Sequence, residues 1–186
     1  MHRLGTVTLE TKRLILRRFN PDDAEDMYRN WASDPEVTHF LTWPCHSSPQ
    51  VSREILEQWA VQYEDGSYFS WGIERKSICQ VIGSIAVVHL NTEIDSAEIG
   101  YCLSRRYWGQ GLMPEALIAV MRYLFEDVGM NRVSACHDVN NPNSGRVMEK
   151  AGLKYEGTLR QAAKNNQGIC DIVLRAALKR EWQSEE

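Results

Sequence analysis

Hydrophobic and polar positions follow two different periods along the chain, and the changes of period predict the order of strands and helices. Alternation from Thr6 to Phe19, seen in Leu14 and Leu16 against their neighbours, predicts a first strand. The run Asn20-Pro21-Asp22-Asp23 supplies a cap and an acidic first turn, which predicts a helix to about Trp31.

The rest of the first half predicts two helices and an antiparallel meander. Asp34-Pro35-Glu36 is typical of a second helix start, and residues 52–63 carry an amphipathic helical pattern. Three strand-like segments follow at residues 68–75, 81–90 and 97–103, separated by short polar turns.

The second half alternates helices with strands. Apolar residues recur at helical spacing in the segment that follows, at Ala116, Leu117, Val120, Leu124 and Val128. Gly129 is expected to end this helix. Residues 132–137 predict a strand, residues 143–151 a helix that stops at Gly152, and residues 155–159 and 169–174 the last strands. The pattern as a whole predicts an α+β fold with a mixed sheet.

Composition and charge exclude several classes of protein. The 186 residues are 43% hydrophobic and contain no repeat or linker, which predicts a single domain over residues 1–186. The net charge of −4 leaves no broad basic stripe, so no nucleic-acid partner is expected. We expect neither secretion nor membrane insertion, because the start lacks an apolar signal core and no segment approaches ~18 apolar residues.

The five cysteines and five histidines predict no metal site and a cytoplasmic location. The cysteines are odd in number and widely spaced, as in reduced cytosolic proteins, and no paired metal-ligand spacing occurs. Cys136, His137 and Asp138 are adjacent in a predicted strand, so their side chains alternate between faces and do not converge as a nucleophilic triad.

The segment from Arg105 to Leu117 carries the most specific chemistry. It passes from a strand end into a helix with Pro114 in its first turn, where no hydrogen bond is lost. Gly109 and Gly111 let the backbone approach an anion, and the free N–H groups and dipole of the helix start favour a pyrophosphate.

Three other interpretations of this glycine-containing segment compete with a pyrophosphate site. Leu112-Met113 stand where a P-loop needs Lys followed by Ser or Thr, so a P-loop is excluded. A dinucleotide fingerprint needs a third glycine, where Pro114 stands, and parallel strands upstream, where an antiparallel meander is predicted. This alternative is therefore disfavoured. A tight turn without any ligand remains as the third alternative.

Two linked motifs resemble the GNAT superfamily of acyl-CoA-dependent N-acetyltransferases. Arg106-x-x-Gly109-x-Gly111 resembles its pyrophosphate motif and follows the strand segment AEIGYCL of residues 97–103 in the family's order. Asn141-Pro-Asn-Ser144 with residues 146–157 resembles its second cofactor segment. The opening, residues 11–28, resembles the branch that contains ribosomal-protein N-terminal (alanine or serine) acetyltransferases.

The resemblance implies a GNAT fold, in which a mostly antiparallel sheet with flanking helices is splayed between the strand ending at Leu103 and the strand from Arg132. It implies acetyl-CoA as acyl donor, no metal, and a primary amine as acceptor, either a protein N-terminus or a small molecule such as an antibiotic, polyamine or amino-acid analogue. Dimers occur in the family, so a homodimer is allowed. The cofactor-binding residues that it implies are Cys102, Leu103, Arg106, Trp108, Gly109, Gln110, Gly111, Leu112, Asn141 and Ser144.

The resemblance also implies two catalytic residues. Glu98 occupies the place of the catalytic glutamate of the histone-acetylating members and would act as a base through a water; the alternative is a solvated strand carboxylate. Ser144 matches the serine proposed as the acid in the ribosomal-protein branch; its alternative role is an N-terminal cap. Met148 stands where many members carry a tyrosine, which leaves a non-catalytic acyl-CoA-binding module as a further alternative.

Overall fold

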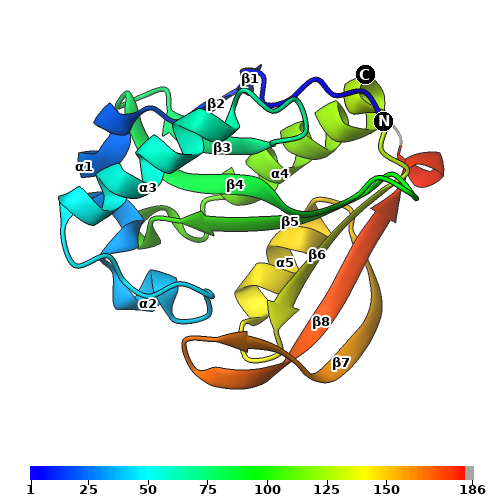
Figure 1. Cartoon of the computed structure of the whole chain (residues 1–186). Coiled ribbons are helices and arrows are strands. Elements are labelled where there is room, and N and C mark those ends of the chain that lie inside the picture. The colour runs from blue at the N-terminus through cyan, green and yellow to red at the C-terminus, as the bar shows by residue number, and fades with distance from the viewer. Residues whose placement is uncertain (183–186) are drawn as a thin grey trace.

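One eight-stranded mixed sheet organises the chain in a computed structural model that describes residues 1–182 (Figure 1). The strand order is β1-β2-β3-β4-β5-β6-β8-β7, and every neighbouring pair is antiparallel except the parallel pair β5–β6. The strands are β1 (Leu9–Glu10), β2 (Leu14–Arg17), β3 (Ser70–Arg75), β4 (Gln80–Asn91), β5 (Ser96–Leu103), β6 (Arg132–Asp138), β7 (Lys154–Asn165) and β8 (Gly168–Leu178).

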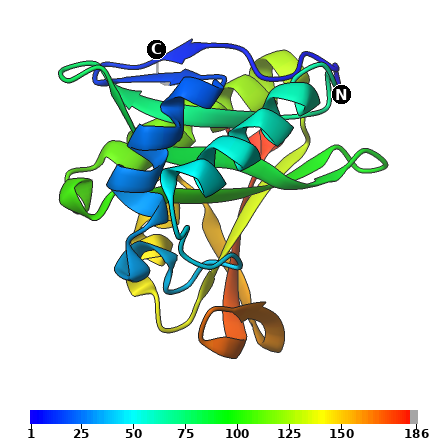
Figure 2. The same ribbon diagram turned by 60° about the vertical axis from the view of Figure 1, so that its left-hand side comes forward.

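Helices cover both faces of this sheet. The helices α1, α2 and α3 lie on one face, whereas α4 and α5 lie on the other, as Figure 2 shows from a second side. The helices are α1 (Ala24–Met27), α2 (Pro35–Thr38), α3 (Pro49–Gln62), α4 (Leu112–Tyr123) and α5 (Pro142–Lys150), with short 3-10 or π turns η1 (Pro21–Asp23), η2 (Tyr28–Ala32), η3 (Arg105–Tyr107), η4 (Leu124–Val128) and η5 (Lys179–Glu181).

Two apolar clusters fix these layers. The larger one lies between the sheet and the pair α4 and α5, where Leu117 and Val120 are fully buried against strand residues such as Leu16 and Ile99. The smaller one packs α1 and α3 against the opposite face of the sheet, and Trp31 is fully buried within it. Burial of this apolar surface is the main force that holds both helical layers on the sheet.

The predicted order of elements is confirmed, but several boundaries differ. The single strand expected over residues 6–19 is divided into β1 and β2, because Leu14 N donates to Thr11 Oγ1 (3.0 Å) and closes a turn between them. The helix α3 begins at Pro49, earlier than residue 52, with Ser48 as its N-cap.

The last two strands are much longer than expected. Residues 154–165 and 168–178 form one hairpin, although few of the β7 side chains are buried. Gly168, with a φ of 110°, permits the tight turn, and Gln167 N donates to Asn165 Oδ1 (2.8 Å) within it. Backbone pairing with β8, rather than a hydrophobic pattern, therefore defines β7.

The splay of the sheet between β5 and β6 is confirmed. The two strands pair only from Ser96 to Glu98 and from Arg132 to Ser134, after which they diverge. We call the unpaired stretch beyond these residues the strand gap. Within residues 1–182, no helix is long and apolar enough to cross a bilayer.

Candidate active site

The edge of β5 presents unpaired backbone groups to the strand gap. Cys102 is paired with Ser84 of β4, and Ser104 N donates to Ile82 O (2.8 Å) two residues further along. Because antiparallel pairing alternates along a strand, the backbone of Cys102 faces β4, while that of Tyr101 and Leu103 faces the gap. Of the two predicted cofactor residues here, only Leu103 therefore turns its backbone to the gap, and because its carbonyl accepts from Trp108 Nε1 (2.7 Å), its N–H is the group left for a ligand.

The Cys102 side chain also lies away from the gap. Its thiol is buried and lies 3.2 Å from Ser84 Oγ, and burial raises its pKa to about 11. The backbone and thiol of Cys102 thus both have partners on β4, and its contact with the cofactor stays a prediction.

The glycine turn (residues 106–112) connects β5 and η3 to helix α4. Gly109 and Gly111 have φ angles of 74° and 72°, a conformation that favours glycine. Within residues 1–182, the N–H groups of Gly109, Gln110 and Gly111 donate no hydrogen bond. A Cβ added at Gly109 would meet no atom within 4 Å, so the space beside Gly109 is open.

Two side-chain hydrogen bonds connect residues of the glycine turn to backbone carbonyls that come earlier in the chain. Gln110 Nε2 donates to Arg106 O (2.9 Å), and Trp108 Nε1 donates to Leu103 O (2.7 Å). Leu112 is buried, so only its backbone is available to a ligand. The helix dipole of α4 and these free N–H groups together form a site suited to an anion.

Glu98 lies at the base of the strand gap on the face that carries α1 to α3. Its neighbours Ala97 and Ile99 are buried on the opposite face, as expected. Glu98 is half-buried rather than freely solvated, and the Cys136 thiol donates to its Oε1 (3.3 Å) across the gap. Burial and the Glu98 charge raise the pKa of Cys136 to about 12, so this thiol remains protonated at neutral pH.

Ser144 approaches the strand gap from α5, on the other face. Its Oγ lies 3.0 Å from Tyr101 Oη, and the Tyr101 hydroxyl also lies 3.0 Å from Ser144 O. Burial raises the pKa of Tyr101 above its usual range, so this phenol remains neutral.

The capping role considered for Ser144 belongs to Asn141. Asn141 is the N-cap of α5, and its Oδ1 accepts a hydrogen bond from Ser144 N (3.3 Å). The Ser144 hydroxyl is therefore not needed as a cap. The Asn141 amide nitrogen donates no hydrogen bond within the described residues and is available to a carbonyl acceptor.

Tyr101 is a site residue that the sequence did not reveal. It follows the buried-face positions Ala97 and Ile99 and looks like another core residue. A buried phenol nevertheless needs a hydrogen-bond partner, and this requirement was the available signal. Met148, by contrast, is 1% exposed and belongs to the core.

Cys136, His137 and Asp138 diverge as expected. Cys136 contacts Glu98, whereas the His137 ring lies against Gly145 of α5. Asp138 lies on the face opposite His137 and accepts a hydrogen bond from the Asn165 side chain. A triad between them is excluded by this geometry. Within residues 1–182, no group of three His, Cys, Asp or Glu side chains is arranged to hold a metal ion.

A clamp joins the β7–β8 turn to the segment that follows α2. Asn166 N donates to Leu41 O (3.0 Å), and Asn166 Nδ2 donates to Thr38 O and Trp43 O (2.8 Å each). These contacts connect the two sides of the splayed sheet below β5 (Figure 1). The clamp therefore borders the face from which Glu98 is reached.

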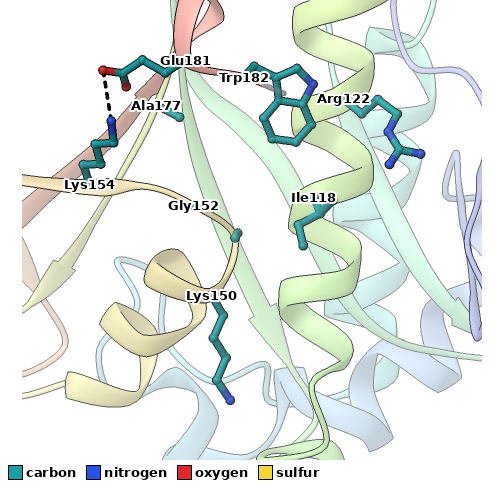
Figure 3. A pocket seen from close by; sticks show the side chains of 9 residues that line it. Ile118, Arg122, Lys150, Gly152, Lys154, Ala177, Glu181 and Trp182 are labelled. Atoms are coloured by element: carbon teal, nitrogen blue, oxygen red, sulfur yellow. Dashed lines mark ion pairs between the residues drawn. The ribbon is translucent and has the colours of Figure 1, made fainter. Parts of the chain in front are cut away.

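A separate cavity of about 270 Å³ opens near the C-terminal ends of α4 and α5 (Figure 3). Ile118 and Trp182 form its apolar wall, and Lys154 pairs with Glu181 (3.2 Å) at its edge. None of the predicted site residues lines it. This cavity is thus distinct from the glycine turn and the strand gap.

The chain matches one family in comparisons with known proteins. Residues 13–154 match the family model described as an acetyltransferase (GNAT) domain. The chain is 33% identical over 158 residues to the uncharacterized N-acetyltransferase YoaA of Bacillus subtilis (strain 168), with 85% of this chain and 89% of that protein covered.

Two further comparisons extend over nearly the whole chain. The ribosomal protein uS5-alanine N-acetyltransferase of Escherichia coli (strain K12) is 28% identical over 185 residues, which cover 95% of this chain and 93% of that protein. The crystal structure of a GNAT-family acetyltransferase from Bacillus anthracis superposes with a TM-score of 0.82 at 22% identity, covering 94% of this chain and 100% of that one. At that identity the superposition shows a shared fold.

Proposed function

The chain belongs to the GNAT family of N-acetyltransferases, and on that premise we propose that it moves the acetyl group of acetyl-CoA to the α-amine of a protein N-terminus. The observation that carries the proposal is the set of unpartnered N–H groups at Gly109, Gln110 and Gly111, beside a strand gap that Glu98 and Ser144 border from opposite faces.

The residues of the glycine turn fit the pyrophosphate of acetyl-CoA. The free donors lie at the N-terminus of α4, and the space above Gly109 is open. Arg106 is exposed beside them and adds positive charge. We assign the Asn141 amide, the N–H of Leu103 and the backbone of Tyr101 to the amides of the pantetheine arm along the strand gap, since Asn141 Nδ2 is without a partner among the described residues and both strand residues face the gap.

Acetyl-CoA supplies an activated acyl thioester, and the side chains of this chain move the protons. We assign Glu98 as the base that receives a proton from the attacking amine through a water, as the C–N bond forms. The C–S bond breaks, and the leaving thiolate takes a proton through the Ser144 hydroxyl. Glu98 then returns its proton to solvent, and Ser144 regains one from solvent, so the net reaction is acetyl transfer and thiol release.

One observation supports a protein N-terminus as the acceptor. The chain resembles the uS5-alanine N-acetyltransferase of Escherichia coli over 95% of its length. Glu98 and the clamp at Asn166 face the same side, so an acceptor of any class would pass the clamp to reach the carboxylate. A cytoplasmic location is part of the proposal and agrees with five free cysteines within the described residues.

A thiol-release assay with matched acceptors tests this function. Peptides that begin with Ala or Ser would be compared with the same peptides blocked at the N-terminus but carrying an internal Lys, and with spermidine and an aminoglycoside. We expect thiol release only with the free N-terminal peptides, and mass spectrometry should place one acetyl group on the α-amine. Turnover of the small amines alone would contradict the acceptor, and binding of acetyl-CoA without turnover of any amine would indicate a non-catalytic module.

A further inference from the structure

We propose that Arg13 is a positioning residue that sets the direction of the anion-binding N–H groups of the glycine turn, with Glu115 and Thr11 holding Arg13 in place. This inference rests on the proposed function, because it concerns the same pyrophosphate site. It concerns residues of the β1–β2 turn, which contact the glycine turn across 97 and 98 positions of sequence and Glu115 of α4 across 102 and 104.

The contacts form a closed network. Arg13 Nη1 donates to Gln110 O (2.9 Å), and Arg13 Nη2 donates to Gly111 O (3.1 Å). The same guanidinium donates through Nε to Glu115 Oε2 (2.6 Å). Glu115 Oε1 also accepts from Arg13 N (2.9 Å) and Thr11 Oγ1 (2.6 Å). One planar fork thus binds a carboxylate and two carbonyls at once.

Peptide geometry connects these carbonyls to the donors. In a trans peptide, the C=O of one residue and the N–H of the next point in opposite directions. When Arg13 holds the carbonyls of Gln110 and Gly111, two N–H groups must point away from Arg13: that of Gly111, one of the three free donors, and that of Leu112 at the start of α4. Glycine at position 111 would otherwise allow the first of these peptide planes to rotate freely.

Charge gives a second reason for the pairing. Glu115 lies in the first turn of α4, where a carboxylate stabilises the helix but would repel an incoming pyrophosphate. Burial alone would raise the pKa of Glu115, but hydrogen bonds from Thr11 and Arg13 outweigh it, so the pKa is lowered and the carboxylate is charged at neutral pH. Arg13 therefore neutralises a negative charge beside an anion site.

The network is too exposed to matter chiefly for stability. The side chains of Arg13 and Glu115 are 42% and 19% exposed, and ion pairs of this kind contribute little to folding. Loss of Arg13 should therefore change ligand binding much more than the melting temperature.

The test is calorimetric titration of acetyl-CoA into Arg13→Ala, with Lys76→Met as the matched control. Lys76 Nζ holds the same β1–β2 turn through Thr11 O (2.8 Å) but has no contact with the glycine turn. We expect the Kd for acetyl-CoA to rise about tenfold or more in Arg13→Ala, the loss typical of one charged hydrogen-bond group, and to stay within about twofold in Lys76→Met.

Two additional variants separate positioning from folding. Arg13→Lys keeps the charge and a long side chain but cannot span two carbonyls and Glu115, so it should fold and still bind acetyl-CoA several-fold more weakly. Adding Glu115→Gln to Arg13→Ala should restore part of the affinity, because the unpaired carboxylate is removed. As a second readout, kcat/KM with S-acetylpantetheine, which lacks the pyrophosphate, should be the same in wild type and Arg13→Lys.

The outcomes distinguish this inference from the proposed function. Wild-type affinity in Arg13→Ala and Arg13→Lys, or equal losses in Arg13→Lys and Lys76→Met, would overturn the role of Arg13 and leave the acetyl-CoA site intact. Equal losses with acetyl-CoA and S-acetylpantetheine would also overturn it, because the effect would not depend on the pyrophosphate. Failure of the wild-type protein to bind acetyl-CoA would instead contradict the proposed function and this inference together.

Discussion

Glu98 and Ser144 border the strand gap from opposite faces of the sheet. Glu98 lies on the face of α1 to α3 beside Cys136, whereas Ser144 and Tyr101 meet on the face of α5. In the proposed mechanism, an amine that approaches from the first face would meet Glu98, the proposed base, while the leaving thiolate would be nearer Ser144 on the second face. This division of roles makes the two residues separable by mutation.

Glu98→Gln should lower kcat/KM by about 10² or more at neutral pH, the usual contribution of a positioned general base. The Kd for acetyl-CoA should stay unchanged, because Glu98 lies away from the glycine turn. Glu93→Gln, in the exposed β4–β5 turn, is the matched control. Unchanged turnover of Glu98→Gln at every pH would remove Glu98 from the mechanism.

Tyr101→Phe tests the hydroxyl that holds Ser144. We expect kcat to fall in Tyr101→Phe and in Ser144→Ala, and the double variant to be no worse than Ser144→Ala, because both changes affect one proton donor. Since the pKa of Tyr101 is raised by burial, its proton is retained as pH rises through 10, and no basic limb should arise from it. Steady-state kinetics from pH 6 to 10 checks both points; additive losses would show that Tyr101 acts independently of Ser144.

The residues found only in the structure share one property. Contacts between segments distant in sequence bring Tyr101, Arg13 and Glu115 to the proposed site, and no local pattern specifies such a contact. Glu98, Gly109 and Ser144 could be proposed from the sequence because each lies in a motif with a fixed order of residues. Orientation was the part that a motif could not supply, as the backbone of Cys102 shows.

At the scale of elements, helices were predicted better than strand ends. The apolar repeat from Ala116 to Val128 specified α4 and η4, and Gly129 ends them with a φ of 84°. The hairpin of β7 and β8 could not be predicted to its full length, because most β7 side chains are exposed and carry no alternation. Its extent is defined by pairing with β8, which is a tertiary property.

The hairpin turn provides a prediction at this scale. Asn166→Ala removes the side-chain bonds to Thr38 O and Trp43 O, which should loosen the clamp that borders the acceptor side. We expect KM for a peptide acceptor to rise several-fold, with kcat and the Kd for acetyl-CoA nearly unchanged, since the glycine turn lies elsewhere. Peptide titrations in the steady state provide the measurement, and Gln161→Ala, in the exposed part of β7, serves as control. An increase in the Kd for acetyl-CoA instead would place the clamp on the donor side.

At the scale of the whole molecule, the splayed sheet connects the local features. Seven neighbouring strand pairs form the sheet, but only β5–β6 is parallel and opens after a few residues. The end of β5 leads directly into the glycine turn and α4, and the end of β6 leads into α5 and Ser144. A donor bound at the turn and extended into the gap would therefore lie between Glu98 and Ser144, the two side chains proposed as catalytic.

The central claim is that the glycine turn binds the pyrophosphate of acetyl-CoA, and calorimetric titration of two tryptophan variants tests it most directly. Gly109→Trp and Gly152→Trp place the same residue at positions with similar φ angles, 74° and 89°, and with no atom within 4 Å of the added Cβ. Only the first would cover the free N–H groups. We predict micromolar binding to wild type and Gly152→Trp and at least about a tenfold loss in Gly109→Trp; equal affinity in all three proteins, or no binding to wild type, would contradict the account.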